Sequence, residues 1–172
     1  MTDTRDVARC WAGFASLGAG LVHLAVVREH FAESALFGVF FLVTGTLQIG
    51  WAMVALARDR MPLPRLVAVA EVGVILLWGV SRTVGLPVGP EVWTPEAAGT
   101  ADVLCVALEL VTVGAIVAWL ALTRSAEHPV RAGRYLVLVG AGALVVAAMT
   151  TPALAATDAG DHAHPHGGHS AH

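Results

Sequence analysis

The chain has 172 residues, of which 56% are hydrophobic and only 13% are charged. A soluble domain carries charge on about a quarter of its residues, so a soluble chain this apolar could not cover its surface with polar groups. Its mean hydropathy of +0.71 therefore excludes an ordinary soluble domain, and its net charge of -3 gives no reason to expect nucleic acid as a partner. The composition predicts an all-α integral membrane protein whose excess apolar surface faces the lipid bilayer.

Five stretches are long and apolar enough to cross a bilayer, which takes about 20 residues of helix. The predicted helices cover residues 8–27, 35–57, 64–84, 101–122 and 135–156, and together they form a compact bundle in a domain of residues 1–156. Arg5 and Arg9 precede the first apolar run, as in a secretory signal. The run is too long for a signal, however, and no small-residue cleavage site follows it before Arg28, so we expect an uncleaved anchor.

The arginines predict how the helices are oriented. Eight of the ten lie before the first helix, between the second and third, or between the fourth and fifth, whereas only Arg28 and Arg82 lie in the other two connections. The positive-inside rule then places the N-terminus in the cytoplasm and, after an odd number of spans, the C-terminus outside. Aromatic residues near both ends of the spans agree: Trp11, Trp51, Trp119 and Tyr135 at one end, and Trp78 and Trp93 at the other. The pattern resembles that of small multi-pass bacterial proteins, so we expect the plasma membrane of a bacterium.

Small residues are frequent within the predicted spans and favour close helix packing in lipid. The glycines concerned are Gly13, Gly18, Gly20, Gly45, Gly73, Gly79, Gly140 and Gly142. The two cysteines, Cys10 and Cys105, differ in predicted depth by roughly 20 Å at 1.5 Å per residue. A disulfide needs Cα atoms within about 7 Å, so both thiols are expected to be free and to act as small core residues.

Polar side chains within the spans form the first candidate site, because an ionisable group near the bilayer centre costs on the order of 3 kcal/mol. The set comprises His23, Thr44, Gln48, Glu71, Arg82, Asp102 and Glu109. At 1.5 Å per residue, His23, Thr44 and Glu109 fall in one layer at roughly 20–22 Å from the cytoplasmic side. Gln48 and Glu71 fall in a second layer at roughly 11–14 Å. Two separate polar layers are therefore predicted.

Two interpretations of this set remain open. In the first it is a functional site, or a path for protons or a cation that runs from Asp102 through Glu109 and His23 toward Glu71. In the second it provides hydrogen bonds between helices that hold the bundle in register. At the outer end of the third span, Arg82 is placed to pair with Asp102 or Glu109. The proline-rich segment 82–99 is either an ordinary connection or an ordered cap over the polar layer.

Haem is not expected as a cofactor, because a bis-histidine haem needs ligands that face each other from different helices. His23 is the single histidine well within a span, and His30 follows it on the same predicted helix.

The C-terminal residues 157–172 form the second candidate site. They hold five histidines, preceded by acidic residues, and lack large apolar side chains, so we expect a disordered tail. Imidazole is a good ligand for copper, zinc and nickel ions. The irregular spacing differs from that of a fixed four-ligand zinc module. The predicted ligands are His162, His164, His166, His169, His172 and Asp161.

Three functions are compatible with these features. The first is a protein that binds a divalent transition metal, or assists its transport, at the extracytoplasmic face, with the tail as the capture site and the buried polar set as an internal site. The second is a structural or assembly subunit that joins membrane-protein partners or a second copy of itself. The third is a membrane-embedded enzyme that uses the His/Glu/Asp set as metal ligands. It is the least favoured, and the chain holds no G-x-x-x-x-G-K-[ST], H-E-x-x-H or G-x-S-x-G motif.

Overall fold

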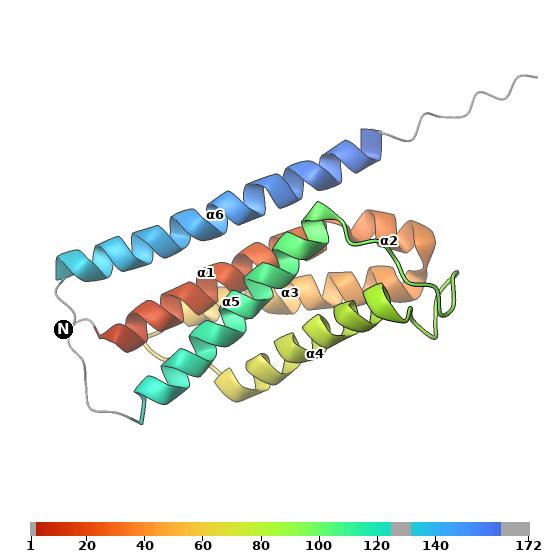
Figure 1. Ribbon diagram of the computed structural model, residues 1–172. Coiled ribbons are helices and arrows are strands. Elements are labelled where there is room, and N and C mark those ends of the chain that lie inside the picture. The colour runs from red at the N-terminus through yellow and green to blue at the C-terminus, as the bar shows by residue number, and fades with distance from the viewer. Residues whose placement is uncertain (1–2, 125–131, 163–172) are drawn as a thin grey trace, which may run out of the picture.

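The computed structural model describes residues 3–124 and 132–162 (Figure 1). These residues form six helices: α1 (Thr4–Ala25), α2 (Val27–Glu33), α3 (Ala35–Ala57), α4 (Pro64–Thr83), α5 (Thr100–Leu122) and α6 (Ala132–His162). All except α2 are long and apolar enough to cross a membrane. The all-helical class and the number of helices of spanning length are therefore confirmed.

The helix ends differ from the sequence prediction at both ends of the chain. α1 begins four residues earlier than predicted, because Asp6 accepts a hydrogen bond from the backbone N–H of Asp3 and so completes a polar first turn. It ends at Ala25, and the chain continues into the unpredicted helix α2. At the other end α6 runs to His162, so residues 157–162, which were expected to belong to a disordered tail, are helical.

α1 occupies the centre of the bundle and packs against α3, α5 and α6 (Figure 1). In its most apolar stretch 67% of the residues are buried, against 11% in α4. Glycines permit the close approach of α1 and α3, because a Cβ atom added to either Gly20 or Gly45 would lie 2.9 Å from the carbonyl oxygen of the other. Close packing through small residues is confirmed for this pair of helices.

The other glycines of the spans fall into two groups, those that contact another helix closely and those that do not. A Cβ on Gly18 would meet Thr150 of α6 at 2.6 Å, and one on Gly142 would meet Trp11 of α1 at 2.6 Å. A Cβ on Gly13 would likewise meet Leu56 of α3 at 2.8 Å. By contrast, nothing described lies within 4 Å of a Cβ on Gly73, Gly79 or Gly140. The packing role predicted for these three glycines is wrong within the described part of the chain, because no other helix described there approaches α4 or α6 at these positions.

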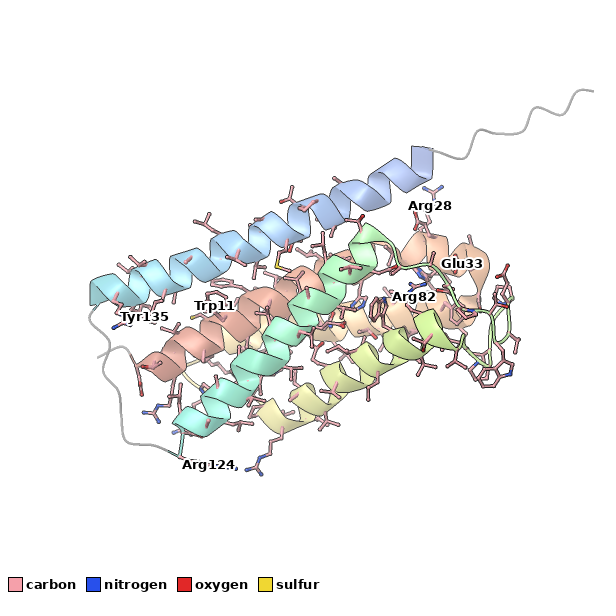
Figure 2. The ribbon with its side chains drawn as sticks, in the orientation of Figure 1. Trp11, Arg28, Glu33, Arg82, Arg124 and Tyr135 are labelled. Carbon is pink, nitrogen blue, oxygen red and sulfur yellow. The ribbon has the colours of Figure 1, made fainter. Side chains whose placement is uncertain are left out.

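The labelled residues in Figure 2 identify the two ends of the bundle. Arg124 lies at the end that also holds Trp11 and Tyr135, and we call this the arginine-rich end. Arg28 and Arg82 lie at the opposite end, beside α2 and the 84–99 loop.

Both cysteines are buried and free, as predicted.

Candidate metal centre within the bundle

Five buried polar side chains from four helices meet in the interior. α1 supplies His23, α3 supplies Gln48, α4 supplies Glu71, and α5 supplies Cys105 and Glu109. Gln48 lies at the centre of the group. Its amide nitrogen donates to Glu71 Oε2 at 3.0 Å and faces Glu109 Oε1 at 3.4 Å, and its oxygen lies 2.8 Å from His23 Nδ1.

This arrangement favours one tautomer of His23. The amide nitrogen of Gln48 is directed at two carboxyl groups, so its carbonyl oxygen must be the atom that faces the imidazole. A carbonyl oxygen can only accept, and therefore His23 Nδ1 carries the hydrogen and donates it. The lone pair of the neutral ring is then left on Nε2, which is the usual arrangement of a metal-binding histidine held by a hydrogen bond on its other nitrogen.

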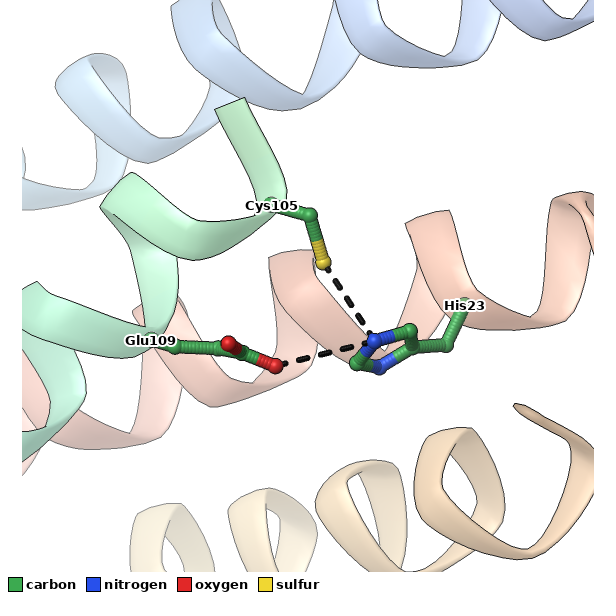
Figure 3. A group of neighbouring side chains, drawn as sticks. All are labelled: His23, Cys105 and Glu109. Atoms are coloured by element: carbon green, nitrogen blue, oxygen red, sulfur yellow. Dashed lines mark hydrogen bonds and ion pairs between the residues drawn. The ribbon is translucent and has the colours of Figure 1, made fainter. Parts of the chain in front are cut away.

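His23 Nε2 faces a thiol and a carboxyl group from α5 (Figure 3). It lies 3.6 Å from Cys105 Sγ and 3.6 Å from Glu109 Oε1. One ligand atom from each of the three residues lies within 4.8 Å of the other two. Ligands bound at 2.0–2.3 Å to a tetrahedral ion stand about 3.3–3.6 Å apart, so both measured distances match such a site. We call these three residues the His23/Cys105/Glu109 triad.

The local sequence explains how the triad assembles. Cys105 and Glu109 are four residues apart on α5, so they project from the same face of that helix. The small residue Ala19, one turn before His23, lets α5 approach α1, and Cys105 Sγ lies 3.8 Å from its carbonyl oxygen. Glu109 is 1% exposed, and its Oε2 atom has no hydrogen-bond partner within the described part of the chain. An unpaired buried carboxyl oxygen beside two metal-ligand side chains fits a cation site.

The prediction of two separate polar layers is wrong. Gln48 contacts His23 and Glu109, which were placed in the upper layer, as well as Glu71 from the lower one. Counting residues along each helix ignores the crossing of the helices and the reach of long side chains. Both bring residues at different predicted depths into contact. Thr44 is half-buried and makes no hydrogen bond to this group among the described residues.

Asp102 lies outside the triad and forms part of an ion-pair cluster toward the opposite end. Arg82 Nη2 donates to Asp102 Oδ2 at 2.9 Å, and Arg82 Nη1 donates to Glu96 Oε2 at 2.5 Å. Of the two partners expected for Arg82, the structure therefore shows Asp102. Asp102 also accepts from the backbone N–H of Gly99 at 2.9 Å, which ties it to the first turn of α5.

A cavity of about 360 Å³ lies between the triad and this ion-pair cluster. His23, Cys105 and Glu109 all contribute to its lining. The 84–99 loop contributes Leu86, Pro87, Val88 and Glu96, so this connection is an ordered cover over the cavity rather than a distant link between helices. Trp78 also lines the cavity, and its indole nitrogen is buried.

Sequence reasoning did not identify Cys105 as a candidate metal ligand and expected it only to fill space. The signal was present, because Cys105 is three residues after Asp102 and four before Glu109 and so shares their helix face. His30, placed on the same helix as His23 by prediction, belongs to α2, and its ring packs on that of Phe41 with centroids 3.8 Å apart.

The predicted tail site is not described by the structure. His164, His166, His169 and His172 lie outside the described residues, and of Asp161 and His162 only the helical backbone is described.

No protein-family model, no curated protein and no solved structure matches this chain. The chemistry of the buried side chains is therefore the basis on which a function can be proposed.

Proposed function

We propose that this protein resides in the plasma membrane of a bacterium, with the arginine-rich end in the cytoplasm and the His-rich C-terminus outside. Five helices of spanning length support insertion. The distribution of arginines supports the orientation, because cytoplasmic connections carry an excess of basic residues.

Within this bundle, the protein binds one transition metal ion at the His23/Cys105/Glu109 triad. The observation that carries the proposal is the convergence of a nitrogen, a sulfur and an oxygen ligand within 4.8 Å in a fully buried place. Gln48 supports it independently, because its hydrogen bond to Nδ1 directs the lone pair of His23 toward the other two ligands.

The ligand set favours zinc. Thiolate and imidazole suit both zinc and copper, and carboxylate is a regular zinc ligand as well, whereas nickel has less preference for this mixture. A divalent ion with one thiolate and one carboxylate also gives a site of zero net charge. Neutrality lowers the cost of holding the ion in an apolar interior, where an uncompensated charge is expensive.

Three protein ligands leave one position of a tetrahedral ion open, which is the arrangement of sites that exchange or activate a ligand. In the proposed orientation the His-rich tail lies on the same side of the membrane as the 84–99 loop. Its histidines would capture ions outside the cell and raise their concentration near the bundle. The protein is thus a metal-binding or transport-accessory protein of the extracytoplasmic face.

Cobalt spectroscopy tests the triad directly, because cobalt(II) replaces zinc and shows a sulfur-to-metal charge-transfer absorption when a thiolate binds it. The tail contains no cysteine, so this absorption reports the bundle alone. We expect the full chain in detergent to develop the band on addition of cobalt and the Cys105→Ser variant to lack it. The matched control is Cys10→Ser, which removes the other buried thiol and should keep the band. A band that persists in Cys105→Ser would refute the proposed site.

A structural role is the second candidate, and the position of Gln48 favours it. One carboxamide contacts side chains from α1, α4 and α5, and the same contacts would hold these helices in register without any ligand. Glu109→Gln separates the two functions. Under the metal proposal it lowers zinc affinity, whereas under the structural one it changes only the thermal stability of the protein in detergent.

A further inference from the structure

The cavity beside the triad has features that metal binding does not use. Its lining is largely apolar, and aromatic rings are contributed by α3 on one side and α4 on the other: Phe37, Phe40, Phe41 and Trp78. A hydrated cation gains nothing from such walls, whereas a planar ring packs well against aromatic side chains. The shape and chemistry of this space therefore point to an organic ligand.

Two donors in the cavity lining have no acceptor. Trp78 Nε1 and Arg82 Nε are both buried, and neither has a hydrogen-bond partner anywhere in residues 3–124 or 132–162. They lie four residues apart on α4 and so share a face of that helix. Buried donors without acceptors are costly, and a ligand that carries acceptor oxygens would satisfy them.

The cavity lies beside an ion-pair cluster and between two helices that do not pack closely on each other. Arg82 pairs with Asp102 and Glu96 at its outer end. In contrast, α3 and α4 make no backbone approach to each other over their described lengths, and the cavity lies between them. Two of its lining residues, Leu36 on α3 and Leu77 on α4, are 57% and 39% exposed on the outer surface of the bundle. Under the bilayer placement proposed above, that surface faces lipid.

From these observations we propose that the cavity binds a lipid-soluble ring compound with carbonyl acceptors, of the quinone class, which enters from the membrane between α3 and α4. The ring lies among the phenylalanines and Trp78, and its apolar tail passes between Leu36 and Leu77. Its carbonyl oxygens accept from Trp78 Nε1 and Arg82 Nε, which are covered by protein in the structure and turn toward the ligand when it binds. The ring site adjoins the triad, because His23, Cys105 and Glu109 also line the cavity, but its proposed contacts lie on α3 and α4.

Quenching of Trp78 fluorescence by decylubiquinone tests this proposal. The full chain is placed in phosphatidylcholine nanodiscs as two single-tryptophan variants, one that keeps Trp78 and one that keeps Trp119, which lies in the core at the arginine-rich end. Quinone dissolved in lipid quenches both in proportion to its concentration. We expect an additional saturable component for Trp78 alone, and equal, non-saturating quenching of both would overturn the proposal.

A cavity-filling substitution provides a test in the otherwise unchanged chain. Val106 lines the cavity from α5, whereas Val103 on the same helix is 51% exposed and does not line it. We expect Val106→Phe to weaken saturable quinone binding by about 10-fold or more, because the added phenyl ring occupies the space of the ligand. Val103→Phe should bind as the parent does. Equal affinity in the two variants would overturn the proposal.

Two further measurements separate the possible failures. Decanol has the apolar tail but no ring, and it should not displace the quinone. Displacement by decanol at equal concentration would mean that the cavity binds an alkyl chain, and it would overturn the assignment to a ring compound. Zinc content measured on the same preparations reports the triad. Zinc bound without saturable quinone binding overturns this inference alone, whereas saturable quinone binding without zinc overturns only the metal proposal.

Discussion

The polar side chains at the arginine-rich end and those in the middle of the bundle find their partners in different ways. At the arginine-rich end three side chains each donate to a backbone carbonyl of a neighbouring segment. Arg9 donates to Ala55 O at 2.5 Å, Trp11 to Leu138 O at 3.1 Å and Trp51 to Pro62 O at 2.7 Å. Such bonds join two neighbouring segments at a time, and the side chains do not converge on a common point.

In the middle of the bundle the side chains instead converge on one another. Gln48 contacts three other side chains, and His23 Nε2, Cys105 Sγ and Glu109 Oε1 face a common point. Separate pairs would have cost less free energy in an apolar interior, because every buried polar group there needs a hydrogen-bond partner. Burial of polar groups alone therefore does not point to a site, whereas the convergence of ligand-type side chains supports the one proposed.

The largest effect should follow the loss of a direct ligand. His23→Ala removes the imidazole, and loss of a partner that only orients a ligand already costs about 10–100-fold in affinity, so we expect zinc affinity to fall by about 100-fold or more. Competition with a chromophoric chelator in detergent measures the change. An affinity within a few-fold of the parent would place the ion elsewhere. The middle of the bundle would then differ from the arginine-rich end only in its hydrogen bonds.

Gln48→Leu should produce the next largest effect. The substitution leaves all three ligands in place but removes the group that orients His23 and contacts Glu71 and Glu109. We expect zinc affinity to fall by about 10–100-fold. The same chelator competition measures it, and an unchanged affinity would mean that the His23 ring is held in place by packing, for instance by Phe41, whose ring centroid lies 5.4 Å away.

A smaller effect, of a different kind, is expected at the arginine-rich end. Trp11→Phe removes the indole donor to Leu138 O and should lower the free energy of unfolding by about 1 kcal/mol. Zinc affinity should stay the same, because Trp11 anchors α6 and does not approach the triad. Thermal unfolding in detergent and chelator competition on the same sample check both parts. A large loss of zinc affinity would show that the two regions are coupled.

The sequence predicts those features of the fold that depend on local hydropathy. The ends of α3 agree with the prediction, and those of α4 and α5 differ by at most one residue, because apolar runs there stop at charged or turn-forming residues. α2 escaped prediction because its seven residues are polar enough to resemble a loop. Its end is set by Ser34, whose hydroxyl accepts from the backbone N–H of Leu36 and starts α3.

The site was predictable only in part, because it depends on how helices cross. His23, Gln48, Glu71 and Glu109 stand out in a sequence, since polar groups in apolar spans are rare. Their meeting point does not, because residue counts give depth along an axis and not the rotation or tilt of a helix. Cys105 is apolar enough to pass as a core residue, and only the position of α1 against α5 brings its thiol to 3.6 Å from His23 Nε2.

The central claim is that the metal site lies in the bundle and not only in the tail. Zinc content by elemental analysis tests it most directly, on protein purified without a polyhistidine tag and lacking residues 163–172. We predict that the shortened chain retains one zinc ion and loses it on substitution of Cys105 by serine. Loss of all zinc on shortening, with zinc retained by the Cys105→Ser variant of the full chain, would contradict the account.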